Sequence, residues 1–363
     1  MSFLFSLFSF IMLNNTKTEN IIKVAINGFG RIGRAFYKLA QKESQIEIVA
    51  VNDLANLENL NYLLKYDTAY GISDNLSLDK DIFYSEPDPQ YLPWGDLNVD
   101  VVIESTGVFN TYKKAEAHIK AGAKKVVLSA PVKEEKILDN LENKEDGIPN
   151  YDLNRKTVLM GINDEELGTC QISANGSCTT NAVSPVLQIL NQKIGIEKAI
   201  LNTIHSYTAT QKLVDSTNKK DFRKGRAGAQ NIIPTTTGAA IATTLVIKEL
   251  AGKFDGMATR VPVLVGSLVD LTFITKKKVT EEEINSILKN AVQDKRWEGI
   301  YNVTEEPLVS SDIINNPYAS LVDLSLTKVV DGNLAKVLIW YDNEIGYTNT
   351  LIKHVLKAGE SLD

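Results

Sequence analysis

The chain contains few of the residues that build disulfide scaffolds and zinc sites. Its 363 residues include only two cysteines, Cys170 and Cys178, and three histidines. Two cysteines cannot form a disulfide framework, and a core of this size does not need one, so we expect a reduced, cytoplasmic setting. Because the cysteines and histidines do not cluster at the spacing of zinc ligands, we expect no metal.

Membrane-length apolar runs and an excess of basic residues are also missing. The apolar stretch at residues 1–13 is shorter than the roughly 20 residues of a membrane span, and it lacks the basic start and the cleavage site of a signal peptide. We expect Met12 to be the true start and residues 1–20 to be a misassigned or disordered extension; a short genuine extension is the alternative. A net charge of −6 argues against a broad nucleic-acid surface, so we expect neither a membrane nor a nucleic-acid partner.

The remaining composition, 44% apolar and 23% charged, is typical of a globular protein of two domains. Up to residue 177, strand-like runs alternate with helical segments, which indicates a parallel sheet with crossover helices. We therefore predict an α/β Rossmann-type domain at 21–177, in which the charged, aperiodic stretch 133–156 is a surface insertion. Long β-rich runs after Cys178 favour an α+β domain with a large, mostly antiparallel sheet at 178–339, and a helix follows at 340–363.

Gly28, Gly30 and Gly33 form a GxGxxG pattern between a predicted strand and a predicted helix. Glycines let the backbone approach a pyrophosphate, and a helix N-terminus offers free N–H donors and partial positive charge. Asp53 ends the next predicted strand, where a carboxylate can bind an adenosine ribose and repel a 2′-phosphate. A tight turn beside a surface aspartate is the alternative, but strand, helix and acid in register favour a dinucleotide site for NAD.

Cys178 directly precedes a segment with helical apolar spacing and has hydroxyl-bearing neighbours. A helix N-terminus lowers the pKa of a thiol, so we expect Cys178 to be an acidified nucleophile. His205 also lies among hydroxyl-bearing residues, and a histidine paired with a cysteine can hold a thiolate and later accept a proton. Cys170 is expected to be an inert buried residue, and His118 and His354 are expected to be ordinary surface or packing residues.

Several longer motifs resemble one family. SCTTN with His205 downstream, followed by RAGAQNIIPTTTGAA, RVP and WYDNEIGY, is similar to glyceraldehyde-3-phosphate dehydrogenase, and the resemblance runs from about Ile21 to about Leu356. It implies that residues 178–339 form a catalytic domain in which Cys178 attacks an aldehyde and His205 accepts a proton while hydride passes to NAD. Inorganic phosphate would then convert D-glyceraldehyde 3-phosphate to 1,3-bisphosphoglycerate, a step of glycolysis and gluconeogenesis.

The resemblance also assigns anion-binding residues. It implies that Thr208 and Arg260 hold the substrate phosphate and that Arg226 adds positive potential nearby, since a guanidinium matches phosphate oxygens. The residues implied for the attacking phosphate are Ser177, Thr179, Thr237 and Gly238.

The cofactor contacts implied by the resemblance extend the glycine pattern. They are Arg31 and Ile32 in the turn, Asp53 at the ribose, Thr106 and Ser129 at strand ends, and Asn343 and Tyr347 in the C-terminal segment. Because Asn343 would lie near the nicotinamide, the last helix is expected to return to the first domain. A homotetramer is implied by the resemblance alone.

Two positions depart from the family pattern. Pro87 stands where an arginine is common beside the adenine, and Ser216–Thr217 replace a proline-containing pair of NAD-specific members. Because Asp53 argues the other way, we expect a preference for NAD with some use of NADP. Two other functions stay open: an erythrose-4-phosphate dehydrogenase, in which water resolves the thioester, and a catalytically silent nucleotide-binding protein on the same fold.

Overall fold

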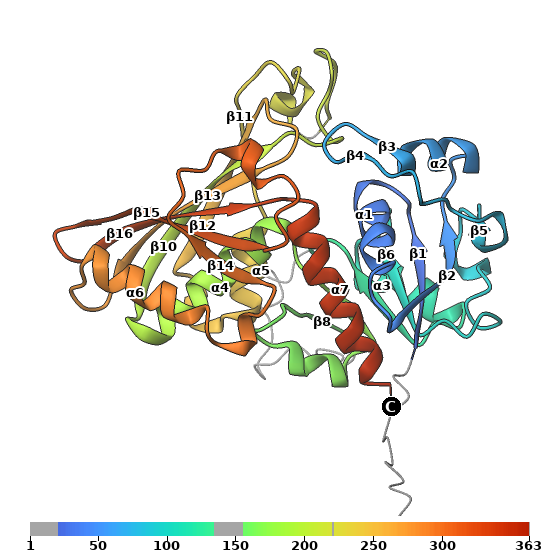
Figure 1. The fold of residues 1–363 in the computed structure, drawn as a ribbon, viewed down its shortest axis with the longest axis horizontal. Coiled ribbons are helices and arrows are strands. Elements are labelled where there is room, and N and C mark those ends of the chain that lie inside the picture. Colours follow the sequence, from blue (N-terminus) through green and yellow to red (C-terminus); the bar gives the residue numbers. More distant parts are fainter. Residues whose placement is uncertain (1–20, 134–154, 220, 363) are drawn as a thin grey trace, which may run out of the picture.

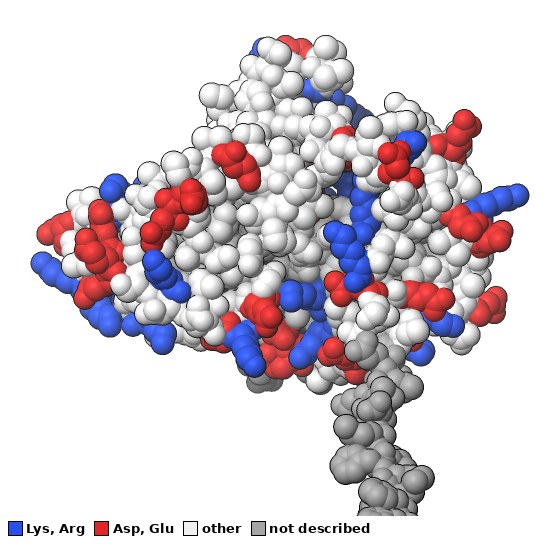
Figure 2. Space-filling model, in the orientation of Figure 1, with Lys and Arg blue, Asp and Glu red and all other residues white. Residues whose placement is uncertain are grey.

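The computed structural model describes residues 21–133, 155–219 and 221–362. The predictions for residues 1–20 and for 134–154 of the insertion fall outside the described residues. Two seven-stranded sheets organise the described chain, and a long C-terminal helix lies between them (Figure 1). On the face drawn in Figure 2, acidic and basic side chains are interspersed, and the chain as a whole carries a net charge of −6.

The first sheet is wholly parallel, with strand order β5-β2-β1-β6-β7-β9-β8. Its strands are β1 (Ile22–Asn27), β2 (Ile46–Asn52), β5 (Phe83–Tyr84), β6 (Val101–Glu104), β7 (Lys125–Leu128), β8 (Arg155–Thr157) and β9 (Ile172–Ala174). The helices of this part are α1 (Arg31–Ala40), α2 (Leu57–Lys65) and α3 (Tyr112–Lys120), and a small antiparallel pair is formed by β3 (Tyr66–Asp67) and β4 (Gly71–Ile72). Strands β6 and β7 are fully buried, as expected for a parallel sheet covered on both faces. The predicted Rossmann-type sheet is confirmed, and β8 includes the last two residues of the predicted insertion.

The second sheet is mostly antiparallel, with strand order β11-β12-β10-β13-β16-β15-β14. Its strands are β10 (Ile196–Ser206), β11 (Ile233–Thr236), β12 (Phe254–Val261), β13 (Ser267–Thr275), β14 (Tyr301–Thr304), β15 (Ser320–Val330) and β16 (Leu334–Tyr341). The helices packed with it are α4 (Cys178–Lys193), α5 (Ala239–Val246) and α6 (Glu281–Ala291). Burial alternates along β13, because one face of the strand meets the core and the other does not. The predicted large, mostly antiparallel sheet is confirmed.

Helix α7 (Ile345–Glu360), drawn in red in Figure 1, packs against α1 of the first part. Its apolar side chains, including Leu351 and Val355, share one core with Ile22 and Phe36. The chain that leaves the second sheet therefore ends on the first. Within the described ranges, no helix is long and apolar enough to span a membrane.

Candidate active site

Cys178 and His205 meet where helix α4 begins and strand β10 ends. Cys178 is the first residue of α4, whose N-terminus is capped by the Ser177 hydroxyl accepting a hydrogen bond from the Thr180 N–H at 3.1 Å. His205 lies near the end of β10, and its Nε2 is 3.4 Å from the Cys178 Sγ. The two residues, 27 positions apart in sequence, therefore meet as a nucleophile and base pair would.

The protonation of this pair differs from the expected acidified thiol. Burial raises the pKa of the Cys178 thiol, against opposing contributions from the Arg260 charge and the Thr179 N–H. Burial, followed by the charge of Arg260, lowers the pKa of His205 to about 3. The prediction of an acidified Cys178 is therefore wrong, because desolvation outweighs these opposing contributions.

Arg260 lies directly beside His205. Parallel pairing of β12 with β10 places Arg260 opposite His205, and the Arg260 Nη1 is 2.6 Å from the His205 Nδ1. The same Nη1 donates a hydrogen bond to the Ser206 carbonyl oxygen at 2.8 Å. The guanidinium predicted to hold the substrate phosphate thus contacts the imidazole that faces the nucleophile.

The residues predicted to bind the attacking phosphate lie at the starts of α4 and α5 and differ in burial. Ser177 is partly exposed, whereas Thr179 is buried and its hydroxyl is 2.9 Å from the Tyr341 hydroxyl. The Thr237 hydroxyl accepts a hydrogen bond from the Ala239 N–H at the start of α5. Gly238 is the exposed N-cap residue of that helix. Each of the two helix N-termini offers N–H groups of the kind that bind anions.

Thr208 and Arg226 lie in the long segment between β10 and β11. The Thr208 hydroxyl is 2.9 Å from the Thr210 hydroxyl. Arg226 is exposed and its Nε donates to the Asp215 carboxylate at 2.7 Å. The structure does not bring Arg226 into contact with Cys178 or His205, so any effect on the site acts at longer range.

The glycine turn is packed tightly at two positions and open at the third. Gly28 has φ of +95°, and a Cβ there would lie 2.7 Å from the Thr106 backbone nitrogen. A Cβ at Gly33 would lie 2.2 Å from the Gly28 carbonyl oxygen, whereas a Cβ at Gly30 would meet nothing within 4 Å. Asp53 braces the turn by accepting a hydrogen bond from the Phe29 N–H at 2.7 Å. The turn therefore leaves open space beside Gly30, where the backbone can approach a dinucleotide.

A buried polar network beneath this turn was not predicted from the sequence. Glu104, the last residue of β6, accepts hydrogen bonds from the Asn27 side chain at 2.6 Å and from the Thr106 N–H at 2.8 Å. The Thr106 hydroxyl donates to the same carboxylate. Asn27 in turn accepts from the Asn52 side chain at 2.7 Å. One carboxylate therefore ties together the ends of β1, β2 and β6, where the predicted cofactor residues begin.

His118 belongs to this network and is completely buried, not a surface residue. Its Nδ1 accepts a hydrogen bond from the Trp94 indole N–H at 3.0 Å, because an indole nitrogen can only donate. The Nε2 therefore carries the proton and donates to Glu104 at 3.1 Å. At the same ends of the strands, the Ser129 hydroxyl donates a hydrogen bond to the Glu104 carbonyl oxygen at 3.0 Å.

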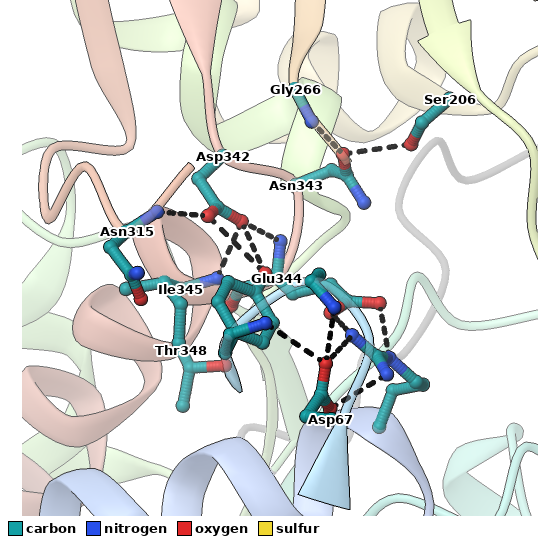
Figure 3. Close-up of polar contacts among 12 residues, drawn as sticks. Asp67, Ser206, Gly266, Asn315, Asp342, Asn343, Glu344, Ile345 and Thr348 are labelled. Atoms are coloured by element: carbon teal, nitrogen blue, oxygen red, sulfur yellow. Dashed lines mark hydrogen bonds and ion pairs between the residues drawn. The ribbon is translucent and has the colours of Figure 1, made fainter. Parts of the chain in front are cut away.

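The segment before α7 holds Asn343 firmly (Figure 3). Its side-chain Oδ1 accepts hydrogen bonds from the Ser206 hydroxyl at 2.8 Å, the Ser267 hydroxyl at 3.0 Å and the Gly266 N–H at 3.3 Å. Its Nδ2 has no partner within the described part of the chain. An amide held in this way has its nitrogen free to donate to a ligand such as a carboxamide oxygen.

Arg31 and the start of α7 join the two parts of the chain. The Arg31 guanidinium donates to the Asp67 carboxylate at 2.8 Å and to the Glu344 carboxylate at 2.8 Å. These carboxylates raise the pKa of Arg31 against the opposing effect of its burial, which has the largest single influence. Ile32, next in the turn, is partly buried against the core. The Arg31 side chain is therefore engaged in ion pairs within the protein, and its backbone is the part that the turn can present to a ligand.

A second buried network holds the loop before Cys178. Tyr347, predicted to contact the cofactor, is buried in the core and donates from its hydroxyl to the Gly176 carbonyl oxygen at 3.2 Å. His354 is also fully buried, with its Nδ1 3.1 Å from the Asn175 Oδ1 and its Nε2 2.7 Å from the Ser173 hydroxyl. These contacts tie α7 to the nucleophile loop, and no local sequence signal pointed to them. Cys170 is buried, and burial raises its pKa, as suits an unreactive thiol.

No group of three or more metal-ligating side chains occurs within the residues that the structure describes. Two family models match the sequence: the glyceraldehyde 3-phosphate dehydrogenase NAD binding domain over residues 22–112 and the C-terminal domain of the same enzyme over residues 177–343. The chain is 44% identical over 360 residues to the glyceraldehyde-3-phosphate dehydrogenase of Mycolicibacterium smegmatis, covering 94% of this chain and 99% of that protein.

Two further relatives agree with this match. Identity is 42% over 354 residues to glyceraldehyde-3-phosphate dehydrogenase 2 of Streptomyces avermitilis, covering 94% of this chain and 99% of the relative. It is 43% over 346 residues to the glyceraldehyde-3-phosphate dehydrogenase of Clostridium acetobutylicum, covering 91% and 96%. With this similarity over both parts and NAD as the cofactor that the first part binds, the chain belongs to the glyceraldehyde-3-phosphate dehydrogenase family.

Proposed function

We propose that this protein oxidises D-glyceraldehyde 3-phosphate with NAD and inorganic phosphate to form 1,3-bisphosphoglycerate. One observation carries the proposal: the Cys178 Sγ lies 3.4 Å from the His205 Nε2, with the Arg260 guanidinium beside the imidazole. A silent nucleotide-binding protein would not need this arrangement. The reaction places the protein in glycolysis or gluconeogenesis.

The chemistry follows from this pair. The Cys178 sulfur adds to the aldehyde carbon to form a hemithioacetal, and the thiol proton passes through the His205 Nε2 to the aldehyde oxygen. The Cys178 N–H at the start of α4 can stabilise negative charge on that oxygen. His205 accepts the hydroxyl proton of this adduct through Nε2 while the carbon gives up a hydride. NAD supplies the hydride acceptor. The resulting thioester keeps the acyl group activated until phosphate attacks it and releases Cys178.

Two anion sites serve this sequence. Thr208 and Arg260 hold the phosphate of the substrate, because the guanidinium matches phosphate oxygens and lies at the catalytic pair. Arg226 contributes positive potential at longer range. The attacking phosphate is bound by Ser177, Thr179, Thr237 and Gly238, where α4 and α5 begin.

The cofactor lies along the carboxyl edge of the first sheet. Its pyrophosphate contacts the turn of Gly28, Gly30, Arg31, Ile32 and Gly33, and Gly30 offers the open space. Asp53 binds the adenosine ribose, Thr106 and Ser129 line the strand ends, Asn343 donates to the nicotinamide carboxamide, and Tyr347 supports that side from within the core. Because Asp53 repels a 2′-phosphate while Pro87 and Ser216–Thr217 depart from the NAD pattern, NAD is preferred and NADP is used weakly.

The protein assembles as a cytoplasmic homotetramer. The support is a group of apolar side chains that the isolated chain exposes between β10 and the start of β11: Leu213 is 85% exposed, Val214 70%, Phe222 85% and Ile232 70%. Apolar groups of this size gain by burial against another subunit. Light scattering of the purified protein should give four times the chain mass of 40.1 kDa.

NADH formation from glyceraldehyde 3-phosphate and NAD, with and without inorganic phosphate, tests the proposal. We expect fast steady-state turnover that requires phosphate. Turnover with erythrose 4-phosphate that does not need phosphate would assign the alternative dehydrogenase activity instead. Cys178→Ser should abolish oxidation and leave NAD affinity unchanged; substantial activity in this variant would show that Cys178 is not the nucleophile.

A further inference from the structure

Asp342, which directly precedes Asn343, is held by both parts of the chain. Its carboxylate accepts hydrogen bonds at 2.9 Å from three backbone N–H groups, those of Asn315, Glu344 and Ile345 (Figure 3). One more donor comes from the first part: the Tyr70 hydroxyl lies 2.9 Å from the Asp342 Oδ1 and 3.2 Å from its Oδ2. Among the described residues, Tyr70 is therefore the only one whose side chain donates to Asp342.

Tyr70 is in turn fixed to the glycine turn. The Asp67 Oδ1 accepts hydrogen bonds from the Ala69 N–H at 2.9 Å and from the Tyr70 N–H at 3.2 Å. Arg31, within the turn, donates to the other oxygen of Asp67 at 2.8 Å, and its guanidinium carbon lies 5.5 Å from the centre of the Tyr70 ring. Burial, followed by the charge of Asp342, raises the pKa of Tyr70, so its hydroxyl keeps the proton that it donates.

These contacts form a closed circuit between the two parts. Its members, in order, are Arg31, Asp67, Tyr70, Asp342, Asn343 and Glu344. The circuit crosses between the parts twice, at the hydrogen bond from Tyr70 to Asp342 and at the ion pair from Glu344 to Arg31. The two crossings lie on either side of Asn343 in the sequence, so they set the position of Asn343 relative to the glycine turn.

We propose that Tyr70 is a positioning residue that holds Asn343 at the distance from the glycine turn that NAD spans. This inference rests on the proposed binding of the pyrophosphate at the turn and of the nicotinamide carboxamide at Asn343. The hydrogen bonds to the Asn343 Oδ1 come from Ser206, Gly266 and Ser267, which all belong to the second part. They orient the amide there but do not fix it relative to the first part. With Tyr70 in place, the nicotinamide meets an amide that is already positioned, and binding loses less conformational freedom.

The affinities for NAD and for ADP-ribose test this role, because ADP-ribose carries the adenosine and the pyrophosphate but no nicotinamide. Titration calorimetry of the whole protein measures both Kd values. Tyr70→Phe keeps the ring near Arg31 and removes only the hydroxyl. It should raise the Kd for NAD about fivefold to tenfold and leave the Kd for ADP-ribose unchanged. Tyr62→Phe removes the hydroxyl of an exposed tyrosine in the neighbouring α2 and should leave both Kd values unchanged.

Asn343→Ala separates this inference from the assignment on which it rests. It should raise the Kd for NAD at least as much as Tyr70→Phe does, and it should leave ADP-ribose binding unchanged. Adding Tyr70→Phe to Asn343→Ala should cause no further loss of NAD affinity, because Tyr70 acts through Asn343.

The possible failures are distinguishable. Unchanged NAD affinity in Tyr70→Phe, with a loss in Asn343→Ala, would overturn the positioning role and leave the Asn343 assignment intact. Equal rises of both Kd values in Tyr70→Phe, or additive losses in the double variant, would also overturn it, since the hydroxyl would then support the first part as a whole. Unchanged NAD affinity in Asn343→Ala would remove Asn343 from the nicotinamide site and the inference with it.

Discussion

Gly30→Ala separates the cofactor contact of the glycine turn from the folding of the turn itself. Gly30 is the N-cap residue of α1 with φ of −69° and ψ of −158°, which residues other than glycine also adopt. A Cβ at this position meets nothing within 4 Å. The substitution should therefore leave the free energy of unfolding unchanged or raise it by about 0.4–1 kcal/mol, because alanine restricts the unfolded chain.

The same methyl group should weaken NAD binding. If the pyrophosphate contacts the turn at Gly30, the methyl displaces it from the backbone N–H groups, and each charge-assisted hydrogen bond lost costs about 1.5–3 kcal/mol. Loss of one such bond corresponds to a rise in the Kd for NAD of roughly tenfold to a hundredfold. Gly30 is exposed and a Cβ there meets no other protein atom within 4 Å, so a loss of affinity would come from contact with the ligand.

Gly33→Ala is the matched control, since its Cβ would lie 2.2 Å from the Gly28 carbonyl oxygen. Forcing the turn apart should cost about 1–3 kcal/mol of stability. Urea unfolding measures the stability of both variants, and quenching of protein fluorescence measures NAD affinity. Gly30→Ala with an unchanged Kd would refute the placement of the pyrophosphate; a large loss of stability in Gly30→Ala would refute the geometry of the turn.

Three further changes test the buried charges and histidines. Glu104→Gln should lower the free energy of unfolding by about 2–4 kcal/mol and weaken NAD binding, because the new amide N–H group faces a donor at either position: Asn27 and His118 at Oε2, or the Thr106 N–H at Oε1. Asp100→Asn, just before β6, should leave NAD affinity unchanged, and equal affinities in the two variants would contradict the role of Glu104. Arg31→Ala removes the ion pairs to Asp67 and Glu344 and should lower the free energy of unfolding in urea by about 1–2 kcal/mol. An unchanged free energy of unfolding would show that these ion pairs contribute nothing to stability. Burial lowers the pKa of His354 from an ordinary 6.5 to about 3, so the unfolded chain takes up the proton at a higher pH than the folded chain does. The free energy of unfolding should therefore fall as the pH drops from about 6.5 toward about 3, by up to about 1.4 kcal/mol per pH unit. His354→Gln should reduce this slope, and an unchanged slope would contradict the burial of an uncharged His354.

The features predicted correctly from the sequence are those that depend on local patterns. The alternation of strand-like and helical segments up to residue 177 indicated a parallel sheet, because each crossover needs a helix of its own. The long β-rich runs after Cys178 indicated a large, mostly antiparallel sheet. Gly28, Gly30 and Gly33 could be placed in a tight turn between a strand and a helix because these elements are adjacent in sequence.

The protonation of Cys178 was predicted wrongly for a physical reason. The sequence shows the helix that begins at Cys178, and a helix terminus acidifies a thiol. It does not show how much protein surrounds the sulfur, and burial of the sulfur raises its pKa. Likewise, His118 and His354 had no distinguishing neighbours in sequence, yet both are completely buried in polar networks that support the predicted cofactor turn and the loop before Cys178.

The sequence by itself determined the class of fold, the glycine turn and the candidates for nucleophile and base, since these depend on residue type and on spacing along one element. Only the tertiary structure decided that Arg260 contacts His205 and that Glu104 joins three strand ends. Strand register sets the first of these contacts and sheet order sets the second. Both contacts follow from the pairing of segments far apart in sequence, which patterns within one element do not encode. The burial of His205 likewise depends on how the elements pack.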